Sequence, residues 1–512
     1  MPGGITINTF IERHADKISG TLSCFDRVVI TGIIPGICYS DGMTGYLNHL
    51  GIRIFDYTKW ADTLRERIRR NAEHLASEAG LKIQHIRKRA VRKEDVIARI
   101  IENRGENPGL VAVLSAMETC PSFQPWHDKK THKTFLRYKE GKCLHYYFYF
   151  IDEHLGLCYL RVPTWAPFRV QFYFNGHNWL AARLRAEGVG YKVLDNAFVF
   201  IEDFKKAQEI SDGLNVEVLH PLLDRFARHY CPVIEGFPYS FHWSLMQVEY
   251  ATDIVFKRQS VLAPIYEECV RTATHSVKPE NIATYLGRKL NGNYRDEMGN
   301  NFNTRIEGTC IKHRMGKVAI KMYDKFHLVL RIETTTNDVS FFKHWREVQR
   351  RDGTSEMKVA IMKKHLFSLN PLREAMQASN RRYLDALAAV DDPSATHKDL
   401  DKVSRPVMDA GRSWAGFNFF HGDDAHLFRT LLRGEFCIGG FRNADLRACL
   451  PGKNQGQISR LLKRLRKHGL IKKAGSCYKY YLTTLGQRVA MMALKLKEMC
   501  IIPLLRGLTQ NV

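Results

Sequence analysis

The chain has 512 residues, so it can bury more than one hydrophobic core and is expected to fold as several domains. Hydrophobic residues (45%) and charged residues (25%) occur in the proportions of a globular protein, but the net charge is +24. An excess of this size favours a nucleic-acid partner and argues against an acidic metabolite as the main ligand.

Targeting and membrane signals are not visible in the sequence. The segment after Met1 lacks the charged and apolar stretches of a signal peptide, and no apolar run is long enough to span a bilayer. The twelve cysteines are scattered without paired spacing. We therefore expect reduced thiols, a cytoplasmic location and no membrane partner.

The chain divides into six regions by composition and periodicity. In order, we predict a basic α/β region (1–110), a β-rich region (111–205), a helical region (206–302), an antiparallel β-meander (303–352), a helical connector (353–420) and a C-terminal domain (421–512). In the β-rich region, residues 144–151 and 156–162 flank Asp152-Glu153-His154, which predicts a hairpin.

The first region carries a dense basic run over residues 82–93. We expect this run to form a second basic patch that faces a polyanion. Its candidate contact residues are Arg87, Lys88, Arg89 and Arg92.

Carboxylates in or beside apolar segments suggest a metal-dependent nuclease as one alternative. The candidates are Asp26, Asp152, Glu249, Asp253 and Glu333. Glu249 and Asp253 are four residues apart in the predicted helical region, which would place both on one helical face as a metal pair. Two solvated acids would produce the same spacing.

The meander is the best catalytic candidate. Its predicted strands are 304–313, 317–323 and 328–335, with turns at Met315-Gly316 and at residues 325–327. Because side chains alternate along a strand, Lys321 and Tyr323 share one face, and Arg331 and Glu333 share one face of the next strand.

Two short stretches, Lys321-Met322-Tyr323-Asp324-Lys325 and Leu330-Arg331-Ile332-Glu333, resemble a segment of phage and plasmid rolling-circle replication proteins. The resemblance implies that Tyr323 is a nucleophile that cleaves DNA, with Glu333, Lys321 and Arg331 in the same catalytic site. The sequence lacks the His–hydrophobe–His metal motif of the best-known members. As an alternative, Arg331 and Glu333 pair with Lys321 as ordinary cross-strand charges.

The C-terminal region contains one strongly amphipathic helix. Ile458, Leu461, Leu462 and Leu465 form an apolar stripe, and the other faces are polar and basic up to Gly469. A first helix follows Asp423 and Asp424, Asn443 is expected to cap a short second helix, and a basic hairpin with its turn at 474–476 follows.

This order of helices and hairpin resembles winged helix-turn-helix domains, including the MarR-like kind. The resemblance implies that the helix after the turn enters the major groove of DNA and that the hairpin touches the backbone or the minor groove. The expected DNA-binding residues are Gln457, Ser459, Arg460, Lys463, Arg464, Lys467, Lys472, Lys473 and Lys479. Of these, Gln457, Ser459 and Arg460 are best placed for base edges.

Together these features predict an α+β, multidomain protein with a mixed α/β and β-rich body, helical segments, a β-meander and a C-terminal winged helix. The first hypothesis is a DNA-binding protein of a mobile element or replicon, with duplex DNA as its partner. A DNA nickase or nuclease using Mg or Mn, and an RNA-binding component of a ribonucleoprotein, are the alternatives; no cofactor is otherwise expected. A last apolar helix, 489–505, could pack back on the hairpin or form a homodimer.

Overall fold

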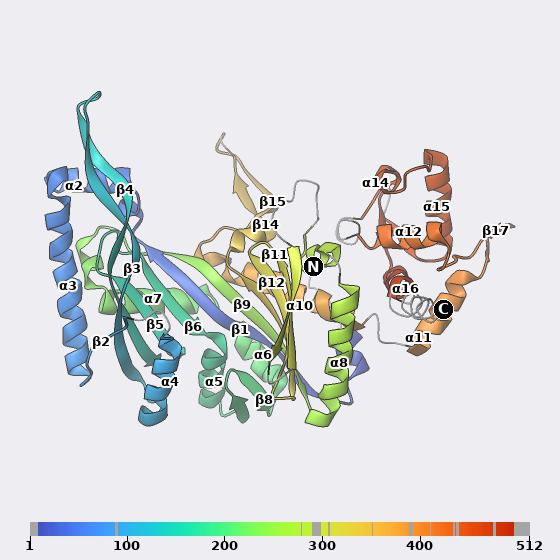
Figure 1. Ribbon diagram of the computed structural model, residues 1–512, viewed down its shortest axis with the longest axis horizontal. Helices are drawn as coiled ribbons and strands as arrows, with labels where there is room; N and C mark the ends of the chain where they lie inside the picture. The colour runs from blue at the N-terminus through green and yellow to red at the C-terminus, as the bar shows by residue number, and fades with distance from the viewer. Residues whose placement is uncertain are drawn as a thin grey trace, which may run out of the picture. The chain divides into compact units, whose positions relative to one another are not determined.

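The computed structural model describes residues 9–495 except 88–90, 278, 289–297, 306–307, 351, 389–392, 410, 434–435, 437–439 and 475–477. The chain forms two compact units, which are described separately. Unit 1 comprises residues 1–21, 251–335 and 375–512, and unit 2 comprises residues 22–250 and 336–374. Both contain helices and sheets (Figure 1), so the predicted α+β, multidomain class is confirmed.

Unit 2 is built on a mostly antiparallel sheet. Its strands pair in the order β1-β6-β5-β4-β3-β2, with β9 next to β1; the pairs from β1 to β3 are antiparallel, and β2 is parallel to β3. The strands are β1 (Ile18–Ile33), β2 (Gln84–His85), β3 (Gly109–Asp128), β4 (Lys133–Asp152), β5 (Gly156–Pro163), β6 (Val170–Asn175) and β9 (His242–Phe256). Separate hairpins are formed by β7 (Tyr191–Leu194) with β8 (Ala197–Ile201) and by β14 (Lys343–Gln349) with β15 (Ser355–Ile361).

Helices cover both faces of this sheet, because alternate side chains of its strands are apolar on both sides. On one face, Phe148 and Phe150 of β4 stack on Tyr230 of α7. On the other, Tyr147 and Tyr149 join a core with α4. The helices of unit 2 are α2 (Ser40–His49), α3 (Tyr57–Glu78), α4 (Lys93–Arg104), α5 (Gly176–Ala186), α6 (Phe204–Asp212) and α7 (Val216–Tyr230).

The predicted hairpin around Asp152 is present as β4 and β5, but β4 begins at Lys133 and is far longer than predicted. The predicted helical region 206–302 contains the long strand β9, and the predicted helical connector contains β15. Both strands are rich in residues that occur in helices as well as in strands, so local periodicity did not identify them as strands.

Unit 1 contains consecutive strands over much of the region predicted as a β-meander, but the predicted strand 304–313 is divided between two strands, and residues 343–349 lie in β14 of unit 2. Strands β10 (Met298–Arg305), β11 (Gly308–Met315), β12 (Val318–Lys325) and β13 (Val329–Thr336) follow one another in the sheet, and β9 continues it beyond β13. The turn between β12 and β13 has positive φ angles at Phe326 (58°) and His327 (57°), which is the conformation of a tight two-residue hairpin.

The remaining elements of unit 1 are mostly helical. They are α1 (Thr9–Arg13), α8 (Gln259–Ser276), α9 (Pro279–Tyr285), α10 (Leu369–Ala388), α11 (Pro393–Ser404), α12 (Gly422–Leu431), α14 (Asn443–Cys449), α15 (Gln455–Lys467) and α16 (Thr484–Lys495). Two small hairpins pair β16 (Val407–Asp409) with β17 (Arg412–Trp414) and β18 (Ile471–Lys473) with β19 (Tyr480–Leu482). Among the described residues, no helix is both long and apolar enough to cross a membrane.

One histidine of unit 1 is held neutral by burial. His313 of β11 is fully buried, with Nδ1 2.7 Å from Asn300 Oδ1 and Nε2 2.8 Å from the Tyr383 hydroxyl. These partners suit a neutral ring that donates at one nitrogen and accepts at the other. Burial lowers the pKa of His313 from 6.5 to about 4.

This lowered pKa predicts a pH dependence of stability. Because the unfolded chain binds the proton more readily than the folded one, the stability contributed by neutral His313 is present above pH 6.5 and is lost as pH falls toward 4. The variant His313→Gln should therefore flatten the plot of unfolding free energy against pH in this window, measured by urea unfolding. The exposed His49→Gln is the matched control. An unchanged slope in His313→Gln would contradict the assignment.

Candidate active site and nucleic-acid interface

A tyrosine, a lysine and a glutamate meet on two neighbouring strands of unit 1. Tyr323 of β12 donates its hydroxyl proton to Glu333 Oε2 at 2.5 Å, and Lys321 Nζ lies 2.5 Å from Glu333 Oε1. Glu333 on β13 is only 1% exposed, whereas the Lys321 side chain reaches solvent. The two donors therefore occupy both oxygens of one buried carboxylate, as the strand alternation predicted for these faces.

This arrangement contains the parts of an activated nucleophile. A phenol attacks poorly until its proton is removed, and a carboxylate already hydrogen-bonded to the hydroxyl is positioned to receive that proton. Lys321 supplies a positive charge beside the same carboxylate. The same three side chains also satisfy one another as a cross-strand ion pair with an added hydrogen bond.

Arg331 does not belong to this group. Its guanidinium forms a two-point ion pair with Asp253 of β9, with Nε–Oδ1 at 2.6 Å and Nη2–Oδ2 at 2.7 Å. Both side chains are at most 1% exposed. Because the charged groups are enclosed and paired, we assign Arg331 to holding β13 against β9 and not to contact with a substrate.

The predicted metal pair Glu249–Asp253 is not brought together by the structure. Both residues lie in strand β9 and not in a helix, and residues four apart in a strand are about 13 Å apart. Asp253 is in addition occupied by Arg331. Spacing alone misled the prediction, because residues i and i+4 share a face in both kinds of element.

A different carboxylate pair forms in unit 2. Oxygens of Asp26 on β1 and Glu249 on β9 lie within 4.8 Å of each other. Asp26 also accepts hydrogen bonds from Asn175 and Asn196, and Glu249 accepts one from Gln247. The sequence shows that both acids lie beside apolar segments. It does not show that their two strands, more than 200 residues apart in the chain, lie next to each other.

Helix α15 in unit 1 is amphipathic as predicted. Ile458, Leu462 and Leu465 are buried in the core formed with α12, α14 and α16, and Leu461 packs at its edge. The helix ends before Gly469, whose φ is +71°, as expected for a glycine that terminates a helix.

Two of the predicted DNA-binding cations on α15 are engaged inside the unit. Arg464 donates to the carbonyl oxygens of Ala415 (3.0 Å) and Gly416 (2.5 Å), pairs with Asp424 at 3.2 Å, and lies 3.8 Å from the centre of the Phe417 ring. This placement makes Arg464 a residue that fastens α15 to the preceding loop, so we remove it from the interface.

Lys467 is the second engaged cation, since it pairs with Asp409 at 2.5 Å. Arg460 and Lys463 remain exposed on the face opposite the apolar stripe, and Lys463 lies 5.4 Å from the centre of the Trp414 ring. Of the predicted DNA-binding cations on α15, Arg460 and Lys463 are therefore the two that the outward face exposes.

The polar residues at the start of α15 also have local partners. The Gln457 side chain accepts from the backbone N–H of Asn454, whose side chain accepts from the backbone N–H of Gln457, so the two residues cap the helix reciprocally. Ser459 accepts from Asn443 Nδ2 at 2.9 Å. Asn443 is the first residue of α14 and not its cap, because Arg442 occupies the cap position.

The remaining predicted contacts are only partly within the described residues. On the hairpin, Lys472 is exposed, Lys473 lies 4.5 Å from the Tyr478 ring centre, and Lys479 lies 5.8 Å from that of Tyr481. The tip of this hairpin (475–477), most of the predicted last helix (496–505), and Lys88 and Arg89 of the second basic patch lie outside the described residues. Arg87 and Arg92 of that patch are exposed in unit 2.

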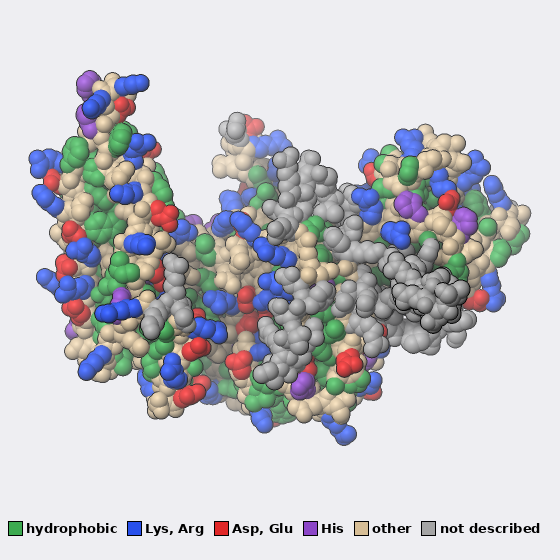
Figure 2. Space-filling model, viewed as in Figure 1, with side chains coloured by type: hydrophobic (Ala, Val, Ile, Leu, Met, Phe, Trp, Pro, Cys, Tyr) green, Lys and Arg blue, Asp and Glu red, His purple; other side chains and the backbone are tan. Residues whose placement is uncertain are grey.

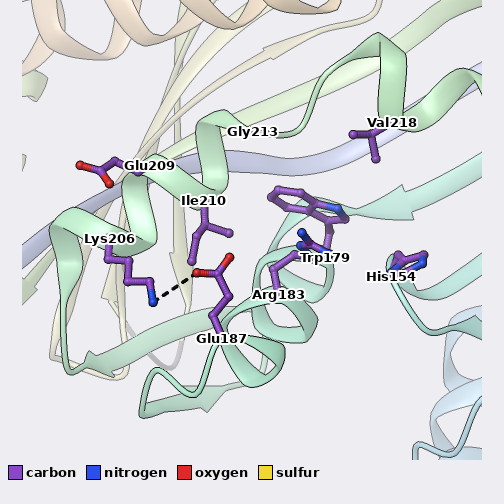
Figure 3. Close-up of a pocket in the computed structure, with 9 residues that line it drawn as sticks. All are labelled: His154, Trp179, Arg183, Glu187, Lys206, Glu209, Ile210, Gly213 and Val218. Carbon is purple, nitrogen blue, oxygen red and sulfur yellow. Dashed lines mark ion pairs between the residues drawn. The ribbon is translucent and has the colours of Figure 1, made fainter.

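Unit 2 also has an open pocket of about 460 Å³ between α5, α6 and the start of α7 (Figure 3). Trp179 and Ile210 supply its apolar wall, and Lys206 pairs with Glu187 at 3.2 Å across its mouth. Arg183 and Glu209 also line the pocket, which therefore combines charges of both signs with an apolar wall.

Comparisons with known proteins give little further information. No protein-family model and no curated protein matches the sequence, so neither the MarR-like resemblance nor RNA binding gains support. The chain is similar to a solved structure described as a rolling circle replication initiator protein from Geobacillus stearothermophilus, with 9% identity and a TM-score of 0.19 over 70% of this chain and 97% of that one. A TM-score this low does not establish a shared fold, so the proposals below depend on the geometry alone.

The Arg331–Asp253 pair leads to a stability prediction. Asp253→Asn would leave a buried guanidinium without its counter-charge, and we expect a loss of about 3–5 kcal/mol of unfolding free energy. The double variant Asp253→Leu/Arg331→Met, which removes both charges, should recover much of that loss. Urea unfolding would measure both.

The matched control is Glu356→Ala, which removes a partly exposed acid that pairs with the exposed Arg350 and Lys358. Its effect should stay below about 1 kcal/mol, because exposed ion pairs are weak. If Asp253→Asn is equally mild, the pair does not hold the sheet together.

Proposed function

We propose that this protein is a DNA-binding protein of a replicon or mobile element, and that α12, α14, α15 and the β18–β19 hairpin act as a winged helix-turn-helix on duplex DNA. The observation that carries the proposal is the division of α15 into two faces. One face is buried in the core, and the opposite face exposes Arg460 and Lys463.

The physical basis is electrostatic. The backbone of duplex DNA is densely charged, and each Lys or Arg that neutralises a phosphate releases bound counterions and adds affinity. An α-helix fits the major groove, where an arginine near the helix start can form two hydrogen bonds to guanine. Arg460, which is exposed in the second turn of α15, is placed for that contact, and Lys463 is placed for the backbone.

This proposal predicts a specific loss of duplex binding. The variant Arg460→Glu/Lys463→Glu should weaken binding to duplex DNA by at least about tenfold near 0.1 M salt, and should reduce the salt slope by roughly 2, since two phosphate or base contacts are lost. Fluorescence anisotropy with a labelled duplex, over a series of salt concentrations, measures both quantities. An RNA duplex of the same sequence serves as the second ligand.

The control Lys205→Glu/Lys402→Glu makes the same change in net charge at two exposed lysines on α6 and α11. It should leave the affinity much closer to that of the unmodified chain. Equal losses in the two variants would indicate a diffuse charge effect, and a loss for RNA alone would favour the RNA-binding alternative.

A second candidate function is cleavage of one DNA strand by Tyr323. The observation that favours it is the hydroxyl of Tyr323 already hydrogen-bonded to buried Glu333, with Lys321 on the other oxygen. In the proposed step the phenol oxygen attacks a backbone phosphorus and its proton passes to Glu333. The bond between phosphorus and the leaving sugar oxygen breaks, and that oxygen takes a proton from solvent.

Lys321 would change partner during this step. Once Glu333 accepts the proton it is neutral, so the ammonium group of Lys321 loses its counter-charge and can stabilise the negative charge that develops on the phosphate. The product is a covalent phosphotyrosine ester, which conserves the energy of the broken bond for a later rejoining reaction.

A nuclease of this kind would be helped by Mg²⁺ or Mn²⁺, which prefer oxygen ligands. Asp26 and Glu249 could hold such an ion, because their oxygens lie within 4.8 Å of each other. The ion would supply positive charge to a phosphate bound to it. Either acid also has hydrogen-bond partners that stabilise it without a metal.

The cleavage proposal predicts a covalent intermediate. Incubation with end-labelled single-stranded DNA or supercoiled plasmid and Mg²⁺ or Mn²⁺ should give a protein–DNA adduct that survives denaturing electrophoresis. Tyr323→Phe should abolish it, and Glu333→Gln should slow its formation by roughly 10²–10⁴-fold, because the proton acceptor is removed.

Tyr478→Phe is the matched control, since Tyr478 is largely exposed and its described contact is with Lys473 and not with a carboxylate. The control should form the adduct at the normal rate. An adduct that persists in Tyr323→Phe would assign the chemistry to another residue, and the absence of any adduct with either metal would exclude the second function.

A further inference from the structure

The β3–β4 hairpin of unit 2 extends well beyond its sheet. Its two strands pair from Gly109–Ile151 to Asp128–Lys133, with a shift of register between Leu110 and Ala112. However, β4 pairs with β5 only over residues 145–152, and β2 reaches β3 only at Leu114 and Ser115. The outer part, residues 119–142, is therefore a two-stranded ribbon, which Figure 1 shows projecting past the ends of α2 and α3. We call residues 119–142 the arm.

One face of the arm is fastened to the unit. Phe123 and Leu136 are buried on this face, and the Phe123 ring lies 6.2 Å from that of Tyr57 on α3. The backbone N–H of Leu136 donates to the hydroxyl of Thr44 on α2 at 2.9 Å. These contacts fix the direction of the ribbon at its base.

The opposite face of the arm combines an aromatic ring with cations. Directly opposed residues of the two strands share a face, and successive residues of one strand alternate between faces. The register therefore places Trp126, Arg137 and Lys139 on the face opposite to Phe123 and Leu136. The Trp126 side chain is 43% exposed, and the Arg137 guanidinium lies 4.5 Å from its ring centre. An exposed indole beside a guanidinium is a surface suited to a polyanion with apolar parts.

The charge of the arm is strongly positive. Residues 124–142 contain six Lys or Arg against two Asp or Glu. One of the two acids, Asp128, is occupied within the turn, where it accepts from the Lys130 N–H at 2.9 Å and the Thr131 hydroxyl at 2.8 Å. Figure 2 shows the Lys, Arg and His side chains gathered at the tip of the hairpin.

We propose that the arm binds duplex DNA by lying along a groove, with Trp126, Arg137 and Lys139 toward the DNA and the lysines of the tip against phosphates. A two-stranded β-ribbon fits the major groove in width. The seven residues from Lys133 to Lys139 span about 20 Å of strand, and duplex DNA carries roughly a dozen phosphate charges over that length. This interface is separate from α15 and from Tyr323 and does not depend on either.

The test removes the tip without disturbing the anchored base. Residues 127–134 are replaced by Asn-Gly, a two-residue turn that can join the paired residues Trp126 and Phe135. This change removes Lys129, Lys130 and Lys133. A second variant, Arg137→Glu/Lys139→Glu, keeps the full length and reverses two charges on the exposed face.

Binding of the full-length protein to one labelled duplex, and to its separate single strands, is measured by anisotropy at several salt concentrations. Both variants should weaken duplex binding by at least about tenfold near 0.1 M salt and lower the salt slope by roughly 2 to 3. Thermal unfolding checks that the variants fold, and Lys205→Glu/Lys402→Glu is the charge-matched control.

The outcomes separate this proposal from the winged-helix proposal. If the arm variants lose duplex affinity while Arg460→Glu/Lys463→Glu does not, the arm is the DNA contact and the winged-helix proposal fails. Unchanged duplex affinity and salt slope in both arm variants, or a loss confined to single strands, would overturn the arm proposal.

Discussion

The buried ion pair between Arg331 and Asp253 is the constraint on which the candidate active site depends. A guanidinium and a carboxylate removed from water cost several kcal/mol each, and only close two-point pairing offsets that cost. The pair therefore tolerates little sliding between β13 and β9. Glu333 lies two residues after Arg331 on the same face of β13, so the register that satisfies the ion pair also fixes the carboxylate that binds Tyr323 and Lys321.

Local patterns in the sequence were sufficient to predict which site residues on the same strand share a face. Alternation along a strand placed Lys321 with Tyr323 and Arg331 with Glu333, and the short turn between β12 and β13 made contact across the two strands the simplest result. The partner of Arg331 was not predictable in this way, because Asp253 is 78 residues earlier and the pairing of distant strands leaves no local signal. The same limit hid the approach of Glu249 to Asp26 and led to a helix being assigned where β9 lies.

Helix α15 of unit 1 shows a second limit of sequence patterns. The apolar stripe of α15 correctly separated the buried face from the polar one, but it gave no distinction among the cations. Arg464 and Lys467 are engaged inside the unit, on backbone carbonyls and on Asp409, whereas Arg460 and Lys463 are exposed. Which of these cations meets a neighbouring segment depends on how Asp409 and residues 412–417 are placed, and that is a tertiary property.

The local engagement of Gln457 and Ser459 has a consequence for how selective this protein can be. The Gln457 side chain caps the helix and the Ser459 hydroxyl accepts from Asn443, so among the described residues Arg460 is the member of the predicted base-reading set that is not engaged locally. One two-point contact to guanine discriminates by about 1–3 kcal/mol, whereas a genome offers roughly 10⁶–10⁹ competing sites. If α15 binds duplex DNA as proposed, it would discriminate poorly among sites by itself, and further selectivity would have to come from DNA shape or from several sites occupied together.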